Sequence, residues 1–497
     1  MTLIATSFIL LAAAVQATNL RALTVPHECT INAIALLQIP GEAPLANEVE
    51  YGCDDGSGLF SPLHLDEIQQ KSLQGLAANG QVHYGKSKIN VHGATITTPS
   101  GKPISAEAKN KENAFNKFIS AELDNIENAL RRRTNSKASK RHFLLFRVTD
   151  SEGRVIDDSP DVMSDNVFGT NGDQINLKTQ LAACSAGQYI VIPGARPPFD
   201  ISDLQSARGV IDIELDISLH NSRADVRNAA ISKAQEVMAL KFNFSDTTSL
   251  TTYADHTLFS LENCYKDCGW AAYASIGGYY QGSYYSMAGI QMHEHGHNLG
   301  LPHSGGLDGL AYTDHTCSMG NPLYGDDLGQ MCFNPAKLWQ LQHFPHPWTV
   351  KRGWYNSTED FFTVDTSSGS QVYEMIGIGE YRFQQESSRK AVALRIIVPG
   401  GRDQYIAFNS AKGANTQNVE ADNLVTIVEW NTTSGYSPSS LKGYIAQGET
   451  FLLGHGLTVT AQCINTSLTP SVACVCVKES SQTCPSDCAC TAPMHHK

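Results

Sequence analysis

Eleven consecutive residues of this 497-residue chain read HEHGHNLGLPH and fit the spacing H-E-x-x-H-x-x-G-x-x-H. On a helix, His293 and His297 lie about one turn apart, so both imidazoles project from one face toward a common point. Gly300 can adopt the positive φ that ends a helix, and Pro302 prevents the helix from resuming, so that His303 can turn back as a third ligand. Three nitrogen ligands leave the fourth position of a tetrahedral zinc ion open to water, as in catalytic zinc sites. The spacing therefore predicts a helix that ends sharply beside one zinc ion.

Glu294 follows the first histidine of this motif. A carboxylate there can take a proton from a water at the open zinc position and pass it to the leaving amine of a peptide, while the metal polarises the scissile carbonyl. The alternative interpretation is that two histidines and a glutamate form a solvated polar face of a helix. Because Gly300 and His303 also stand at the required places, we favour a zinc-dependent hydrolase with Glu294 as its general base.

A methionine in a tight turn below the metal is the next element that such a site needs. Met319 stands in the run Cys317-Ser318-Met319-Gly320, sixteen residues after His303. A thioether at this place can pack under the imidazoles. A methionine taken alone is more often a plain core residue, but after the zinc motif we interpret Met319 as this Met-turn.

The motif also resembles that of a known family. The run from Gln291 to Leu301, followed by Ser304-Gly305, is similar to the gametolysin family of metzincins, the algal cell-wall-lysing proteases. Further matches are Cys268-Gly269-Trp270-Ala271, Cys317-Ser318-Met319-Gly320, Cys332-Phe333-Asn334-Pro335-Ala336-Lys337 and Gly353-Trp354-Tyr355, and the resemblance extends from about residue 142 to 430.

The resemblance implies zinc bound by His293, His297 and His303, Glu294 as catalytic base and Met319 as the Met-turn. It also implies an edge strand that binds peptide substrate in extended form. Some other metzincins carry a tyrosine two residues after the methionine, whereas this chain has Asn321. An additional tyrosine ligand therefore has no support, and neither Tyr312 nor Tyr324 can be assigned that role.

Residues 1–17 form a short apolar stretch that ends in a cleavage-site pattern, Val15-Gln16-Ala17, which is typical of a secretory signal peptide. No other run of eighteen or more apolar residues follows, so we expect no stable membrane span in the mature form. Thirteen cysteines fit export to an oxidising compartment. The net charge of −13 argues against a nucleic-acid surface. We therefore expect a secreted protein, located in the extracellular space, the cell wall or the extracellular matrix.

The cysteines fall into groups that suggest pairs. Cys264 with Cys268 and Cys317 with Cys332 are plausible local disulfides, which leaves Cys184 unassigned. We expect the region of the C-terminal cysteines to contain too few apolar residues for a core, so three bridges are favoured over a second zinc cluster. These are Cys463, Cys474, Cys476, Cys484, Cys488 and Cys490.

Residues 18–141 are interpreted as a propeptide. The basic runs Arg131-Arg132-Arg133 and Lys140-Arg141 are processing candidates, and we favour cleavage near Arg141. A solvated linker is the alternative, and both can hold because a protease needs an exposed loop to cut. Cys29 or Cys53 could donate a thiolate to the zinc as a cysteine switch, but a disulfide between the two is the simpler account.

The predicted fold class is α+β. Residues 142–355 are expected to form a metzincin-like catalytic domain with a twisted mixed sheet and the zinc-binding helix. Strand patterns cover residues 143–148, 189–192, 211–219 and 256–261, and Ser222 can cap a helix that continues to residue 240. Residues 356–462 alternate in short runs typical of a β-sandwich-like domain, which either binds matrix polymer or supports the catalytic unit. Residues 463–497 form a Cys-rich tail.

The sequence thus predicts a secreted zinc endopeptidase, made as a zymogen, that hydrolyses peptide bonds of extracellular matrix or cell-wall glycoproteins. The alternative is a non-catalytic secreted zinc-binding matrix or adhesion protein, but a structural metal site has no need of Glu294. Substrate preference, calcium requirement and oligomeric state are not encoded in these patterns. The sequence also offers four glycosylation candidates, Asn243, Asn356, Asn431 and Asn465.

Overall fold

The chain is represented by a computed structural model. It describes residues 28–37, 48–54, 59–63, 65, 67–90, 95–97, 103–105, 139–263, 270–323, 325, 328–343, 360–364, 369–383, 390–398, 401–431, 436–485 and 490. The predicted signal peptide and the Arg131–Arg133 run lie outside these residues. No described helix is long and apolar enough to cross a membrane.

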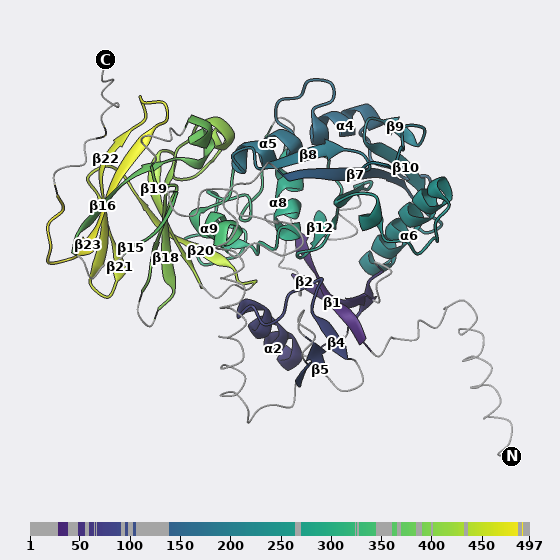
Figure 1. The fold of residues 1–497 in the computed structure, drawn as a ribbon, viewed down its shortest axis with the longest axis horizontal. Coiled ribbons are helices and arrows are strands. Elements are labelled where there is room, and N and C mark those ends of the chain that lie inside the picture. The colour runs from purple at the N-terminus through teal and green to yellow at the C-terminus, as the bar shows by residue number, and fades with distance from the viewer. Residues whose placement is uncertain are drawn as a thin grey trace.

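Three parts of the chain make up the fold (Figure 1). The N-terminal segment comprises the described residues from 28 to 105, the central domain those from 139 to 343, and the C-terminal domain those from 360 to 490. In the view of Figure 1 the N-terminal segment lies below the central domain and the C-terminal domain lies to its left. Together they form the mixed α+β structure that was predicted.

The N-terminal segment is built around a disulfide between Cys29 and Cys53, which joins its first two strands. Its first strand also pairs with the sheet of the central domain. The elements are β1 (Glu28–Leu37), β2 (Val49–Asp54), β3 (Ser61–Pro62), α2 (Glu67–Ala78), β4 (Lys88–Asn90), β5 (Thr95–Thr97) and β6 (Pro103–Ser105).

The central domain contains the predicted sheet and the motif helix α8. Its elements are β7 (Ser139–Thr149), α4 (Pro160–Phe168), α5 (Leu177–Cys184), β8 (Tyr189–Pro193), β9 (Gln205–Ala207), β10 (Val210–Glu214), α6 (Arg223–Phe242), η1 (Leu250–Thr252), β11 (His256–Ser260), β12 (Ala272–Ser275), β13 (Tyr280–Ser283), α8 (Ala288–Asn298), β14 (Ser304–Gly305) and α9 (Pro335–His343).

Strand order in the shared sheet is β6-β5-β4-β1-β12-β13-β11-β7-β10-β9, with β8 paired to β7 and β2 and β3 attached through β1. β7, β8, β10, β11 and β13 are parallel neighbours, whereas β12 is antiparallel to β13. Within the central domain β12 is thus the edge strand, and β1 of the N-terminal segment covers that edge.

Side chains of β7 point alternately to the two faces of the sheet, and the apolar ones explain why helices cover both faces. Phe143 and Leu145 belong to a core shared with α4, α5, α8 and α9, whereas Leu144 and Phe146 belong to a core shared with α6. In the view of Figure 1, α4 and α5 lie above β7 and β8, and α6 lies below them. Ser222 caps α6 by accepting a hydrogen bond from the Asp225 amide, as predicted.

Two sequence predictions in this domain need correction. The strand expected over residues 211–219 ends at Glu214, because the chain leaves the sheet there. Arg141, the favoured processing residue, lies inside β7, where its side chain is 4% exposed and forms an ion pair with Asp255. A protease could reach that bond only after the strand opened, so the structure argues against cleavage of the folded chain at Arg141.

The C-terminal domain consists of two sheets, ordered β14-β20-β19-β18-β17-β15 and β16-β23-β22-β21, whose apolar residues share one core. Its elements are β15 (Phe361–Val364), β16 (Gln371–Ile376), η3 (Ile378–Phe383), β17 (Ala393–Ile396), β18 (Asp403–Asn409), η5 (Gly413–Asn415), β19 (Leu424–Trp430), β20 (Ser439–Ile445), β21 (Thr450–Gly454), β22 (Leu457–Asn465) and β23 (Val472–Glu479).

This domain packs firmly against the central domain. β14, which directly follows the third motif histidine, pairs in parallel with β20. Trp339 of α9 lies against Tyr405, with ring centroids 5.7 Å apart, and both belong to the core that contains Met292 of α8. The C-terminal domain therefore supports the motif region.

The predicted Cys-rich tail begins too early. Residue 463 lies in β22, and β23 follows within the same sheet, so the β-rich domain continues to Glu479. Cys474 and Cys476 of β23 are buried among valines and therefore contribute to a core, contrary to the expectation that this region lacks one. Disulfides join Cys463 to Cys490 and Cys476 to Cys484.

Candidate metal centre

Helix α8 places the first two motif histidines side by side and fully buries them. The Nδ1 atom of His293 lies 2.7 Å from the Ser318 carbonyl oxygen, and that of His297 lies 2.9 Å from the Leu301 carbonyl oxygen. Each Nδ1–H therefore donates to a main-chain carbonyl, which leaves both Nε2 atoms free to act as acceptors.

The third histidine meets the other two through the predicted turn. α8 ends at Asn298, and Gly300 has a φ of 84°. The Nε2 atom of His303 then lies 3.0 Å from the Nε2 atom of His297. Ligand atoms of all three histidines lie within 4.8 Å of one another, so the structure brings together the three predicted ligands.

Several buried polar atoms at this site have no hydrogen-bond partner within the described part of the chain. They include Nε2 of His293 and both carboxylate oxygens of Glu294. Burial lowers the pKa of His293 to about 4 and lowers those of His297 and His303 well below the usual value. Neutral imidazoles that converge on one point fit a metal ion such as zinc.

Glu294 lies on the same helix and is fully buried. Burial raises the pKa of its carboxyl group well above the usual value. A carboxyl group that is next to the histidine triad, with no hydrogen-bond partner in the described part of the chain, is available to bind and move a proton. The structure thus places Glu294 where the sequence predicts the general base.

Met319 packs directly under α8. The amide of Gly320 donates to the carbonyl oxygen of Cys317 at 2.8 Å, which closes a tight turn around Met319. A Cβ atom added to Gly296 would lie 2.1 Å from the Met319 sulfur, so the thioether occupies the space that a side chain at Gly296 would need. This is the geometry expected of the predicted Met-turn.

A buried polar network fixes the chain on either side of His303. Asp314 Oδ2 accepts hydrogen bonds from the Ser304 hydroxyl at 2.7 Å and from the Asn334 amide at 2.9 Å. The Ser439 amide donates to the His303 carbonyl oxygen at 3.3 Å. The C-terminal domain and the Asp314 network therefore hold the third histidine in place.

Three further residues near the triad were not identified from the sequence. The Tyr312 ring centroid lies 4.1 Å from that of His303, the Tyr436 hydroxyl lies 3.2 Å from His297 Nδ1, and Glu48 Oε2 lies 3.7 Å from His303 Nδ1. Glu48 belongs to the N-terminal segment and Tyr436 to the C-terminal domain. No local sequence signal marks them, since only tertiary folding brings them to the motif. Tyr324 lies outside the described residues.

His295, the remaining histidine of α8, lies outside the histidine triad. Its imidazole is fully buried on the other side of α8, with Nε2 3.0 Å from the Tyr189 hydroxyl oxygen. It fills the core between α8 and the sheet.

The disulfides confirm one expectation about the cysteines, the bond between Cys29 and Cys53, and correct another, the pairing of Cys317 with Cys332. Cys29 and Cys53 are bonded to each other, so neither thiolate is available as a cysteine switch. Cys332 pairs with Cys184 rather than with Cys317, which is buried and free. Cys264 and Cys268 lie outside the described residues.

The candidate glycosylation residues differ in their surroundings. Asn243 is exposed where α6 ends, whereas Asn431 is half-buried. The Asn465 side-chain amide donates to the Cys490 carbonyl oxygen at 3.0 Å, so a glycan there would displace that bond. Asn356 lies outside the described residues.

Comparison with known proteins supports the resemblance found in the sequence. Residues 164–349 match the family model described as Gametolysin peptidase M11. Among curated proteins no match is found. Among solved structures, the chain is similar to wild-type OgpA from Akkermansia muciniphila at 11% identity, over 63% of this chain and 95% of that chain. Its TM-score of 0.28 is too low to carry an argument.

Proposed function

With the predicted resemblance to the gametolysin peptidase family confirmed over residues 164–349, we propose that this protein is a secreted zinc-dependent endopeptidase. The observation that carries the proposal is the buried triad of His293, His297 and His303 beside Glu294, whose carboxylate oxygens have no hydrogen-bond partner among the described residues. The site lies in the matched segment, which indicates a peptidase. We further propose a metzincin-like central domain and a β-sandwich-like C-terminal domain.

The residues of the triad would hold zinc through their Nε2 atoms, because each Nδ1 of the two helix histidines is engaged by a carbonyl oxygen. When bound, zinc would supply Lewis acidity toward the scissile carbonyl and acidify a water. Glu294 accepts the proton of the attacking water and returns it to the leaving amine. Met319 and the Asp314 network keep the imidazoles in position for this chemistry.

The proposed substrates are peptide bonds of extracellular matrix or cell-wall glycoproteins, as the resemblance implies. β12 is the edge strand that would pair with an extended peptide, because it runs beside α8 within the central domain. The proposed zymogen contains the N-terminal segment, whose strand β1 covers this edge. Processing would occur upstream of β7 rather than at Arg141.

Hydrolysis of casein or gelatin by the purified secreted protein tests this function. We expect hydrolysis that a chelator abolishes and that zinc restores. His303→Ala should lose both bound zinc and activity, whereas His455→Asn, at an exposed histidine of the C-terminal domain, should retain both. A zinc-loaded protein that cleaves no protein or peptide would instead favour the non-catalytic zinc-binding alternative.

A further inference from the structure

Strand β1 occupies the edge of β12 in an antiparallel register that leads to the metal centre. Ile34 lies opposite Ser275, and Leu36 lies opposite Tyr273. The carbonyl oxygen of Leu36 accepts a hydrogen bond from the Tyr312 hydroxyl at 2.7 Å, and the Tyr312 ring packs against that of His303. A peptide that pairs with β12 in the same direction as β1 would therefore reach the histidine triad at the position that Leu36 occupies.

Beside this edge, two arginines of α6 bind a carboxylate from the N-terminal segment. Glu50 of β2 accepts hydrogen bonds from Nε and Nη2 of Arg223 at 3.0 and 2.7 Å, and from Nη1 of Arg227 at 3.3 Å. Burial alone would raise the pKa of Glu50, but the charges of Arg227 and Arg223 hold it below the usual value. The arginine pair is thus a strong binding site for an anionic side chain.

Arg227 is fully buried, and Phe60 and Glu50 of the N-terminal segment contact its guanidinium group. Its guanidinium carbon lies 4.2 Å from the ring centroid of Phe60 and 5.7 Å from that of Tyr273. Nε and Nη2 have no hydrogen-bond partner within the described residues. When Glu50 and Phe60 leave, the guanidinium group of Arg227 loses this carboxylate and becomes available to another anion.

The place of a substrate side chain follows from the register. Ile34 of β1 lies between Ser275 of β12 and Glu50 of β2, and the three residues are aligned across the strands. Arg227 spans the same interval, since it lies near Tyr273 of β12 and binds Glu50. A long acidic side chain at the position of Ile34 would therefore point toward the same guanidinium groups.

The wall of this site belongs to the central domain. A pocket of about 330 Å³ opens beside Glu50 and is lined by His220, Asn221, Ser222, Arg223 and Trp270. Ser222, Arg223 and Ala224 belong to the amino-terminal end of α6, where the helix dipole also favours an anion.

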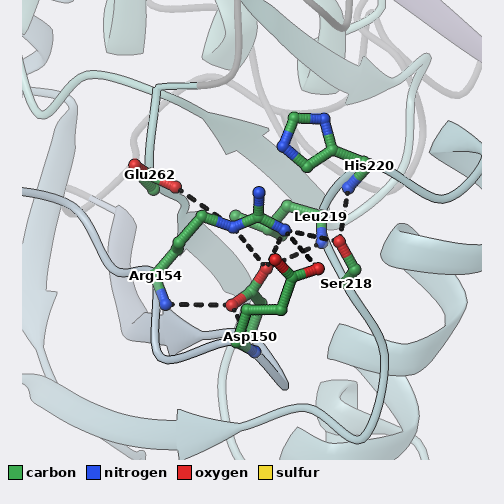
Figure 2. Close-up of polar contacts among 7 residues, drawn as sticks. Asp150, Arg154, Ser218, Leu219, His220 and Glu262 are labelled. Atoms are coloured by element: carbon green, nitrogen blue, oxygen red, sulfur yellow. Dashed lines mark hydrogen bonds and ion pairs between the residues drawn. The ribbon is translucent and has the colours of Figure 1, made fainter.

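The loop before α6 is anchored independently of the N-terminal segment (Figure 2). Asp150 accepts hydrogen bonds from the Leu219 amide at 3.0 Å and from Arg154 Nε at 2.9 Å. Arg154 in turn donates to the Ser218 hydroxyl. The loop that carries His220 therefore has supports of its own when the segment departs.

We propose that Arg227 and Arg223 form a subsite for an acidic side chain of the peptide substrate, and that Glu50 fills this subsite as an internal substitute while β1 occupies the edge of β12. The subsite lies on the amino-terminal side of the scissile bond, since Ile34 precedes Leu36 by two residues. This inference rests on the proposed peptidase function. It assigns the N-terminal segment the role of a competitor for both the backbone and the side-chain interactions of substrate.

The test uses the active secreted protein and sets of quenched fluorescent peptides. Within each set, one residue on the amino-terminal side of the cleaved bond is Glu, Gln or Lys. We expect kcat/KM for the Glu peptide to exceed that for the Gln peptide at least about tenfold, or about 1.4 kcal/mol, at the position that binds the arginines, because the carboxylate forms charge-assisted hydrogen bonds. Arg223→Glu should remove or reverse this preference.

Lys233→Glu is the matched control, because it makes the same charge change on α6 in a pair with Glu236, away from Glu50. It should leave the preference for Glu intact. Equal hydrolysis of all three peptides at every position, unchanged by Arg223→Glu, would overturn the subsite while the peptidase function stands. If the zinc-loaded protein hydrolyses none of the peptides and no protein substrate, the proposed function and this inference both fail.

Discussion

The contact between Gly296 and Met319 predicts the outcome of a single added methyl group. In an exposed helix, replacement of glycine by alanine stabilises by about 0.5–1 kcal/mol because alanine loses less backbone entropy. At Gly296 the new Cβ atom would lie 2.1 Å from the Met319 sulfur, far inside van der Waals contact. Overpacking of this kind costs about 1–3 kcal/mol, so Gly296→Ala should destabilise the protein on balance.

A double-mutant cycle separates this clash from other effects. Met319→Ala alone should cost about 2–5 kcal/mol, because a fully buried side chain is removed. In the double variant Gly296→Ala/Met319→Ala the clash is absent, so its cost should be smaller than the sum of the two single changes. Denaturant unfolding measures the three free energies, and competition with a chromogenic chelator measures zinc affinity.

Gly75 of α2 provides the matched control. A Cβ atom there would meet nothing within 4 Å, so Gly75→Ala should be neutral or stabilising and should leave zinc affinity unchanged. Gly296→Ala should lower both stability and zinc affinity, since the displaced thioether lies under the imidazoles. If Gly296→Ala behaved like Gly75→Ala, or if the two changes at the metal centre were additive, Met319 would not support α8 in the way described.

Three more predictions concern the surroundings of the site. Asp314→Ala should destabilise the protein by about 1–3 kcal/mol and weaken zinc binding, because the buried donors of Ser304 and Asn334 lose their acceptor. An unchanged free energy of unfolding and an unchanged zinc affinity would refute the role of this network. The Cys317 thiol, whose pKa burial raises to about 12, should react with a thiol reagent only after unfolding without reductant, and labelling of Cys332 instead would contradict the disulfide assignment. The pKa of Glu50 is lowered in the folded chain, so its ion pairs with the two arginines stabilise the docked segment fully above pH 4.5. This stabilisation is lost as the pH falls through the folded pKa of Glu50. Hydrogen exchange of the β1 amides, corrected for intrinsic rates, should therefore become faster in acid. A Glu50→Gln variant should lack that step.

The sequence was sufficient for the parts of the site that are set by local geometry. His293 and His297 converge because one helical turn separates them, and Gly300 ends the helix through its positive φ. The same reasoning located Ser222 as the cap of α6. Each of these predictions depends only on residues that are close together in the sequence, and the structure agrees with them.

Long-range pairing limited the remaining predictions. The pair Cys317 and Cys332 was favoured because the two residues are close in sequence, yet Cys332 bonds to Cys184 at a separation of 148 residues. Loop-closure entropy grows slowly with length, so sequence proximity is a weak guide to disulfide pairing. Arg141 was placed in a linker because the apolar pattern begins at Phe143, but main-chain pairing with β8 extends the strand upstream of that pattern.

The C-terminal cysteines form disulfides as predicted, but the core around two of them was missed for a different reason. Cys474 and Cys476 alternate with valines in β23 and are buried like small apolar residues. They had been counted only as disulfide partners. The segment therefore looked too polar to form part of a sheet.

The most direct test of the central claim is the activity of Glu294→Gln with zinc bound. The change preserves shape and removes only the ability to accept and return a proton. We expect one zinc per chain, as in the unaltered protein, and a loss of at least about a hundredfold in the rate of peptide hydrolysis. Full activity of the zinc-loaded variant would contradict Glu294 as the general base of this site.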